Sequence, residues 1–314
     1  MIHPEIEPFL AAWDAAWARL PEGQEGPAGR RAFFEVIAKE MRMETPAGVS
    51  TEEERHVDSP AGPVRVRIFR PEGLAKDDAA PLPVHVYLHG GGWMQGSPET
   101  HWDITARLAA WGGRVVVSVD YALAPEDPFP AAFEQVCAVL RAIHADPAGW
   151  DVDGARLSVG GDSAGGNLAA AAAIALRGEV PLIAQLLVYP ACDFDMTRPS
   201  YLENPDGPLV KPGPAVGRMY TGGKEELLTS DPRVAPLLAE SHAGLPPSYV
   251  AVAENDPLRD SGVAYAEALQ AACVPLEFSA GPGLIHGYLR AMPFSDRART
   301  SLRAMSDWLS GLEG

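Results

Sequence analysis

Short apolar runs alternate with amphipathic stretches along most of the chain. Between Val64 and Arg70, valine and isoleucine alternate with arginine, the period-two pattern of a strand with one solvated face. Continuous apolar runs then recur at 84–88, 114–119, 156–159, 184–189, 249–253 and 275–279. Stretches with helical periodicity separate most of them, at 101–111, 131–145, 164–177, 261–273 and 296–312. Strands buried on both faces with helices between them predict an α/β fold around a mostly parallel sheet.

Two parts of the chain do not follow this rhythm. Residues 3–20 carry an apolar stripe at three- and four-residue steps, and a second helical stretch runs from 31 to 43. Residues 193–224 are rich in Pro, Gly and Asp and contain no clear strand. Long insertions between core strands often cover a binding site. We therefore expect 1–53 and 193–224 to form a helical cap on a catalytic domain spanning 54–314, over the carboxyl ends of its strands.

The charge balance narrows the range of partners. The 314 residues include 25 Lys and Arg against 42 Asp and Glu, a formal net charge of −17. Such a surface repels phosphate backbones and anionic lipid, so we expect neither nucleic-acid binding nor stable membrane association. The longest apolar run, Leu168–Leu176, is half of a membrane span, and no signal-peptide pattern is present at the start. These features predict a cytoplasmic protein.

The cysteines favour no special chemistry. Cys137, Cys192 and Cys273 are too few and too scattered for a disulfide framework or a zinc site. Each lies in an apolar stretch, so buried free thiols are the simplest expectation.

The strongest chemical signal is the run GGDSAGGN at 160–167. It follows an apolar strand and opens an alanine-rich helix, which places Ser163 on a strand-to-helix turn. Gly161 and Gly165 supply the small neighbours that such a tight turn needs, as in the nucleophile elbow G-x-S-x-G. The positive end of the helix dipole also favours negative charge that develops at Ser163.

A second signal is the run HGGGW at 89–93, directly after the strand VHVYL. Three glycines allow the backbone to approach a bound group and to direct N–H donors at one point, which is the requirement of an oxyanion hole. A glycine-rich phosphate loop would carry a lysine after the glycines, and none is present here. Given Ser163, the run is interpreted as an oxyanion-hole segment.

A serine nucleophile needs a histidine base and an acid that orients it. Of the histidines after Ser163, His286 follows the last predicted strand at its carboxyl end, whereas His242 precedes a strand. Asp256 stands at the tip of YVAVAEND, and Asp260 is a rival that could instead cap the next helix. We therefore predict His286 as the base and Asp256 as the acid.

Five motifs in this order resemble the hormone-sensitive-lipase-like branch of the α/β-hydrolase esterases: HGGGW, YALAPEDPFPAA, GDSAGGN, DPLRDSG and IHGY. The resemblance covers the chain from about residue 54 to the end. It implies an α/β-hydrolase fold of about eight strands, a helical cap and serine carboxylesterase activity that needs no metal or cofactor. It also implies a triad of Ser163, Asp256 and His286.

The same resemblance implies an oxyanion hole formed by Gly91, Gly92 and the N–H of Ala164. Trp93 and Tyr189 are candidate walls of the substrate pocket, although a core position is equally compatible with either. One motif departs from the family pattern, because Ala122 and Asp127 replace an arginine and a histidine. We expect this change to remove an ion pair near Glu126.

Several alternatives stay open. The same triad could serve an interfacial lipase, with Phe9, Trp13 and Trp17 facing lipid, or an amidase or peptidase. A non-catalytic small-molecule receptor on this fold is the least favoured, because His286 is present. The preferred substrates are soluble esters with C4–C8 acyl chains, an expectation from the resemblance. A monomer and a homodimer are both compatible with the sequence.

Overall fold

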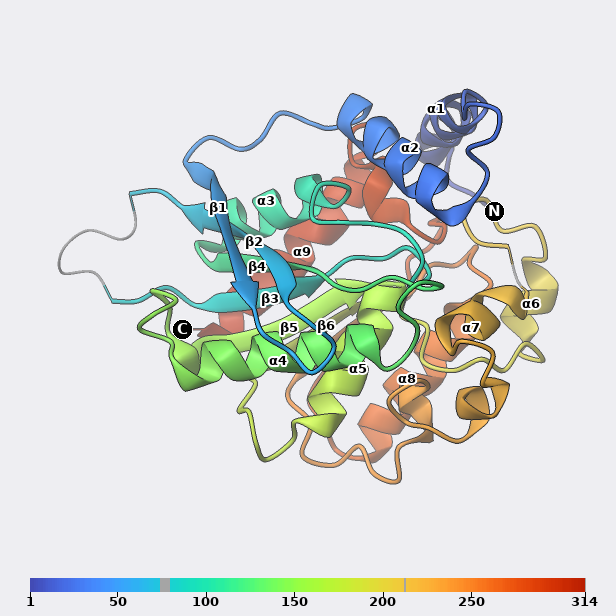
Figure 1. Cartoon of the computed structure of the whole chain (residues 1–314). Helices are drawn as coiled ribbons and strands as arrows, with labels where there is room; N and C mark the ends of the chain where they lie inside the picture. Colours follow the sequence, from blue (N-terminus) through green and yellow to red (C-terminus); the bar gives the residue numbers. More distant parts are fainter. Residues whose placement is uncertain (74–79, 212, 314) are drawn as a thin grey trace.

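The computed structural model describes residues 1–73, 80–211 and 213–313, and its centre is a twisted sheet (Figure 1). Within these residues the sheet has eight strands in the order β1-β2-β4-β3-β5-β6-β7-β8. The strands are β1 (Val49–Val57), β2 (Val64–Pro71), β3 (Val84–Leu88), β4 (Val115–Asp120), β5 (Leu157–Asp162), β6 (Ala184–Val188), β7 (Ser248–Ala251) and β8 (Leu276–Ser279). β2 is antiparallel to both neighbours, and the pairs from β4 to β8 are parallel. The α/β fold with a mostly parallel sheet is therefore confirmed.

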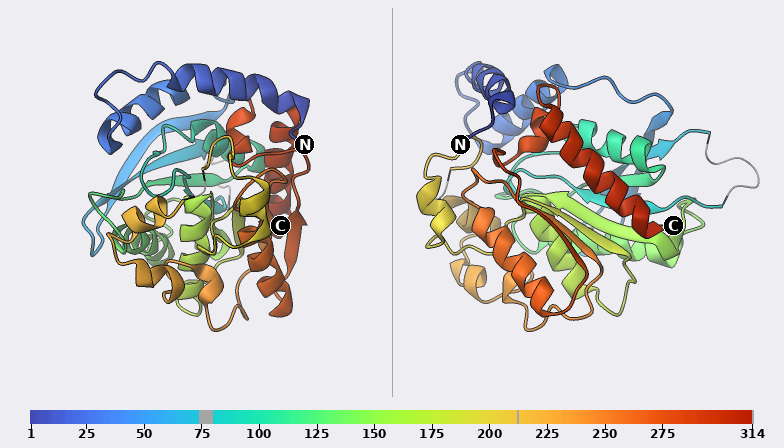
Figure 2. Two further views of the ribbon diagram at one scale, coloured as in Figure 1. Left: turned by 90° about the vertical axis from the view of Figure 1, so that its right-hand side faces the viewer. Right: turned by 180° about the vertical axis from the view of Figure 1, so that it is seen from behind.

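Helices cover both faces of the sheet. The α-helices are α1 (Glu7–Trp17), α2 (Pro27–Glu40), α3 (Trp102–Gly112), α4 (Ala131–Ala145), α5 (Ala164–Ala175), α6 (Pro199–Glu203), α7 (Ala215–Tyr220), α8 (Arg259–Ala271) and α9 (Asp296–Glu313). Short 3₁₀ segments are η1 (Pro4–Ile6), η2 (Gly154–Arg156), η3 (Glu225–Thr229), η4 (Pro236–Leu238) and η5 (Tyr288–Ala291). Figures 1 and 2 show α4, α5 and α8 on one face, and α3 and α9 on the other.

Each face of the sheet has its own hydrophobic core. Alternation along a strand sends successive side chains to opposite faces. In β4, Val115, Val117 and Val119 join the core shared with α4, α5 and α8, whereas Val116 joins the core shared with α3 and α9. This double burial explains why the central strands are continuous apolar runs in the sequence.

The strand β1 was missed by the sequence pattern. Its sequence VSTEEERHV is almost entirely polar, and its residues are exposed or half-buried except for Val57. β1 is an edge strand held by backbone pairing with β2, so no apolar face marks it in the sequence. It begins at Val49, so the expected boundary at residue 53 falls inside a strand of the sheet.

The two segments that break the rhythm lie at the same end of the sheet. Figure 1 shows α1 and α2 at the upper right, with α6 and α7 below them on the same side. The insertion contains these two short helices and no strand among its described residues, which exclude residue 212. Figure 2 (left) views this face directly and shows α1 and α2 along one edge of it.

Two further expectations concern accessibility. Cys137 and Cys192 are buried, but Cys273 is exposed, because it follows α8 on the surface; the expectation of three buried thiols is wrong for this residue. Among the described residues, no helix combines the length and apolar character that crossing a membrane requires.

Candidate active site

Ser163 occupies the sharp turn between β5 and α5. Its backbone has φ 56° and ψ −117°, a conformation that L residues rarely adopt. The strain is retained because Ser163 N–H donates to Val188 O at 2.8 Å and Ser163 O accepts from Asn167 N–H at 3.0 Å. A Cβ on Gly165 would lie 1.9 Å from Leu88 O, and one on Gly161 would lie 2.3 Å from it. The flanking glycines therefore allow α5 to approach β3 closely.

Ser163, His286 and Asp256 form a continuous hydrogen-bonded line. Ser163 Oγ–H donates to His286 Nε2 at 2.8 Å, and His286 Nδ1–H donates to Asp256 Oδ2 at 2.7 Å. Asp256 is fully buried, and its second oxygen accepts from Leu258 N–H at 2.8 Å. The acid and the histidine come from neighbouring loops, because Asn255 and Ile285 form an isolated parallel bridge beyond β7 and β8.

The rival residues lie elsewhere. Asp260 is inside the first turn of α8, so it does not cap that helix as expected; its carboxylate accepts from Ser200 N–H at 2.8 Å and pairs with Arg259. His242 is buried against Tyr265, with its Nε2 3.2 Å from Pro236 O. Neither residue contacts the line of Ser163, His286 and Asp256.

The glycine run after β3 forms a tight loop beside Ser163. Gly91 and Gly92 have φ values of 137° and 62°. His89 Nδ1–H donates to Gly90 O at 3.1 Å. In a trans peptide the C=O and the following N–H point in opposite directions, so this bond turns Gly91 N–H away from His89. Within the described residues, no hydrogen bond uses the N–H of Gly91, Gly92 or Ala164.

His89 itself is buried and neutral. Its ring stacks on Tyr121 at a centroid distance of 4.1 Å, and Tyr121 OH donates to His89 O at 2.6 Å. Burial lowers the pKa of His89 to about 3. A neutral ring with its proton on Nδ1 is therefore the form that contacts Gly90 O at physiological pH.

The buried carboxylate of Asp162 also binds the glycine loop. Asp162 Oδ1 accepts from Gly90 N–H and from Tyr87 OH, both at 2.9 Å. Burial alone would raise the pKa of Asp162, but neighbouring His101, Arg290 and the Tyr87 hydroxyl outweigh it and keep this pKa below its ordinary value. The carboxylate that precedes Ser163 is thus an ionised anchor for the glycine loop.

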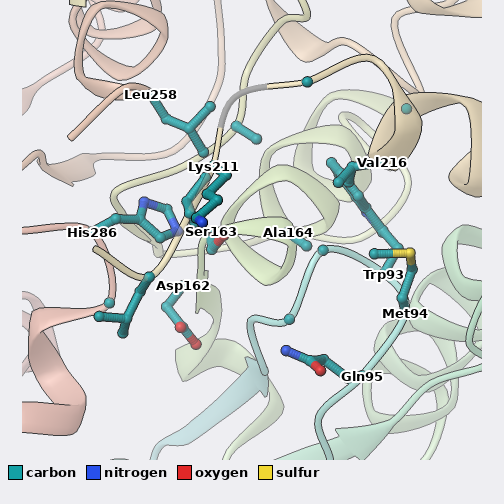
Figure 3. Close-up of a pocket in the computed structure, with 18 of the residues that line it drawn as sticks. Trp93, Met94, Gln95, Asp162, Ser163, Ala164, Lys211, Val216, Leu258 and His286 are labelled. Atoms are coloured by element: carbon teal, nitrogen blue, oxygen red, sulfur yellow. Dashed lines mark hydrogen bonds between the residues drawn. The ribbon is translucent and has the colours of Figure 1, made fainter. Parts of the chain in front are cut away.

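These groups surround one cavity of about 240 Å³ (Figure 3). Ser163 lies between His286 and Ala164, and Trp93, Met94 and Val216 lie across from His286. The lining comes from the two N-terminal helices, the glycine loop, the elbow, the insertion and the segments that follow β7 and β8. It includes Trp13, Phe34, Gly91, Gly92, Trp93, Met94, Ala164, Phe194, Tyr201, Leu209, Val210, Lys211, Val216, Leu258 and Arg290. Most of these side chains are apolar.

The two expected wall residues separate. Trp93 lines the cavity and stacks on Tyr220 at a centroid distance of 4.2 Å. Tyr189 lies beside His286 instead, with its ring 4.8 Å from the imidazole ring and its hydroxyl 3.5 Å from Asp162. The interpretation of Tyr189 as a wall is corrected, because its fully packed ring supports His286 and does not border the cavity.

Sequence reasoning missed the cavity residues that come from distant helices. Trp13 and Phe34 belong to amphipathic stripes that look like ordinary packing faces, and Arg290 gave no signal at all. Arg290 Nη2 lies 2.7 Å from His101 Nε2, and its guanidinium carbon is 4.6 Å from the Phe34 ring centroid. The contact joins α2 to the floor of the cavity.

Glu126 has an ion-pair partner although position 122 is an alanine. Arg31, from α2, pairs with Glu126 at 2.6 Å, so a residue almost a hundred positions away replaces the arginine that Ala122 removes. The local motif could not predict this pairing because the new partner lies in a different part of the chain.

The chain is similar to known alpha/beta hydrolases and esterases. Residues 85–290 match a family described as alpha/beta hydrolase fold. The esterase LipI of Mycobacterium tuberculosis (strain ATCC 25618 / H37Rv) is 45% identical over 240 residues, which cover 74% of this chain and 73% of LipI. A hyperthermophilic esterase from the archaeon Pyrobaculum calidifontis superimposes with a TM-score of 0.87 at 33% identity, covering 99% of each chain. EstE1, a thermostable carboxylesterase from a metagenomic library, gives a TM-score of 0.83 at 34% identity, covering 91% of this chain and 97% of EstE1.

Proposed function

Because the chain belongs to the alpha/beta hydrolase fold family, we propose that it is a serine carboxylesterase with Ser163 as its nucleophile. The family match and the esterase relatives confirm the resemblance to hormone-sensitive-lipase-like esterases that the motifs indicated. The observation that carries the proposal is the continuous line of Ser163, His286 and Asp256 at the edge of an apolar cavity.

The mechanism follows from the hydrogen bonds. His286 Nε2 takes the proton of Ser163 Oγ as this oxygen attacks the ester carbonyl carbon, and Asp256 holds the ring with its other proton on Nδ1. The carbonyl oxygen becomes an oxyanion, for which the N–H groups of Gly91, Gly92 and Ala164 are the proposed donors. The tetrahedral intermediate then expels the alcohol, which receives the proton from His286.

The second half of the reaction repeats these steps with water. His286 takes a proton from the water molecule as its oxygen attacks the acyl carbon on Ser163. Collapse of the second tetrahedral intermediate releases the carboxylic acid and returns the proton to Ser163 Oγ. Each proton that leaves one oxygen is passed to another through His286, so the residues of this chain are sufficient for the cycle.

We assign the cap to the N-terminal helices and the insertion 193–224. Trp13 and Phe34 from the helices, and Phe194 and Val216 from the insertion, meet around the cavity. A mostly apolar pocket of about 240 Å³ suits a soluble ester of short or medium acyl length, and C4–C8 chains are the proposed range. The alternatives of an interfacial lipase or an amidase act on different substrates with the same triad, and the assay below decides between the esterase and the lipase. That the protein is cytoplasmic, and a monomer or homodimer, stays a prediction.

The test is hydrolysis of p-nitrophenyl esters from C2 to C12 by the wild type and by Ser163→Ala and His286→Ala. We expect a maximum between C4 and C8, and a loss of about 10³-fold or more in kcat for each variant. His242→Gln, which changes the other histidine after Ser163, is the matched control and should keep most of the activity. Higher turnover on emulsified long-chain triglyceride than on dissolved butyrate would favour the lipase. A folded wild type without esterase activity would reject the proposal and favour a receptor.

A further inference from the structure

Arg31 joins the N-terminal helices to the glycine loop. It lies in α2, and its guanidinium contacts three groups on two loops of the catalytic domain. Nε–H donates to Met94 O at 2.5 Å, and Nη2–H donates to Ala124 O and to a carboxylate oxygen of Glu126, both at 2.6 Å. The side chain is only 22% exposed, whereas that of Glu126 is 51% exposed. The two backbone contacts are therefore the better shielded part of the interaction.

One partner of Arg31, Met94, lies in the outer limb of the glycine loop, by which we mean the residues 93–95 that follow the glycines. Met94 N–H and Gln95 N–H both donate to Gly91 O at 3.2 Å, which closes a turn over Gly91 and Gly92. Ala124 N–H donates to Trp93 O at 2.8 Å. Arg31 thus binds Met94 O, which directly follows Trp93 in the chain. It also binds the carbonyl of Ala124, the residue whose N–H donates to Trp93 O. Figure 3 shows Met94 and Trp93 on the side of the cavity opposite His286.

The inner limb of the glycine loop, residues 89–90, is held by side chains of the catalytic domain. Tyr121 OH donates to His89 O, and Asp162 accepts from Gly90 N–H. On the outer limb, the contacts from Arg31 come from a different part of the fold. Three glycines in succession have little conformational preference of their own, so the direction of their N–H groups depends on how both limbs are held.

We propose that Arg31 is a positioning residue for ester hydrolysis, which keeps the N–H groups of Gly91 and Gly92 directed at the developing oxyanion. The inference rests on the proposed esterase function. It gives α2 a role in stabilising the transition state, in addition to the wall that Phe34 provides. A helix that only covered the cavity would affect substrate binding instead, so the two roles differ in their kinetic signature.

The experiment compares Arg31→Met with two variants of the same helical pair. Arg19→Met removes a surface arginine that follows α1, pairs with Glu40 at the end of α2 and, within the described residues, makes no hydrogen bond or ion pair with the glycine loop. Phe34→Ala removes a wall of the cavity. With p-nitrophenyl butyrate we expect Arg31→Met to lower kcat by about 10- to 100-fold, less than the loss of a whole donor, with KM within about twofold. Phe34→Ala should mainly raise KM, and Arg19→Met should change neither.

A second measurement separates positioning from a general loss of structure. An alkyl trifluoromethyl ketone adds Ser163 Oγ to its carbonyl carbon, passes the serine proton to His286 and leaves an oxyanion in the same place as the transition state. Its affinity for Arg31→Met should fall by the same factor as kcat/KM, whereas the affinity of a ground-state analogue such as a butyramide should not change. Arg31→Lys keeps the charge but cannot reach all three partners, so it should show a smaller loss of the same kind.

The outcomes distinguish the two proposals. If wild-type activity depends on Ser163 but Arg31→Met and Arg31→Lys retain full kcat, or lose activity only through KM, the positioning role is wrong and the esterase stands. If the wild type hydrolyses no ester, the proposed function fails first. If Arg31→Met does not fold, Arg31→Lys takes its place in the test. An Arg31→Lys variant that has the kcat of the wild type but binds butyramide more weakly contradicts the positioning role.

Discussion

Asp256 and Asp260 carry the same carboxyl group in different surroundings. Asp256 is fully buried and accepts from His286 Nδ1–H, whereas Asp260 is partly exposed and contacts Arg259 and the backbone of Ser200. Only the first can fix the tautomer of the histidine, because only it contacts the ring. The second ties α6 to α8.

The pair therefore offers a matched test of the acid. Asp256→Asn should lower kcat by about 10³- to 10⁴-fold, because the amide favours the wrong tautomer of His286. Asp260→Asn keeps an acceptor for Ser200 N–H and should retain near-wild-type kcat with a small loss of stability. Steady-state kinetics and thermal unfolding of both variants check this. Equal losses of kcat in the two variants would contradict the assignment of Asp256.

The residues of the site differ in how far the sequence predicts them. Ser163, Asp256 and His286 each follow a strand, so chain order and strand ends were enough to find them. Trp13, Arg31 and Arg290 act through partners far away in the chain, such as the contact of Arg31 with Met94. Nothing local marks such contacts, because they depend on how the N-terminal helices dock.

At the scale of elements, the site depends on the close approach of β3, β5 and α5. β3 and β5 are neighbours in the sheet, and the end of β3 meets the first turn of α5 at Leu88 O. This contact places the glycine loop and the elbow at one point. The central strands were predictable because they are buried on both faces, whereas β1 at the edge was not, because its polar residues need only backbone pairing.

The close approach of β3 and α5 predicts that two glycines in helices differ in how well they tolerate substitution by alanine. Gly165→Ala brings a Cβ within 1.9 Å of Leu88 O, so either β3 or α5 must shift, and we expect a loss of about 3 kcal/mol or more of stability together with activity. Gly311→Ala in α9 meets no atom within 4 Å and should be neutral or stabilising by about 0.5–1 kcal/mol. Urea unfolding and butyrate hydrolysis measure both. A Gly165→Ala variant as stable as the wild type would show that β3 and α5 can move apart without a cost in stability.

At the scale of the whole molecule, the fold buries neutral histidines at the centre of the sheet. His85 lies within β3, with its Nδ1 2.9 Å from Ser158 Oγ of β5, and His89 follows the same strand. Burial lowers the pKa of each to about 3, with nearby Arg114 adding to the effect at His85. In the unfolded chain both rings would titrate near their ordinary value of about 6.5.

This difference predicts that acid weakens the fold before carboxylates are protonated. As the pH falls below about 6.5, the unfolded chain takes up protons that the folded chain excludes, so stability decreases until the folded pKa of about 3 is reached. Each histidine contributes a slope of up to about 1.4 kcal/mol per pH unit. Urea unfolding at pH 7, 6, 5 and 4 should show this decline, and His85→Gln, which cannot titrate, should reduce the slope by one proton. An unchanged slope in that variant would mean that His85 takes up a proton in the folded protein, and that the sheet admits charge at a position the structure keeps fully buried.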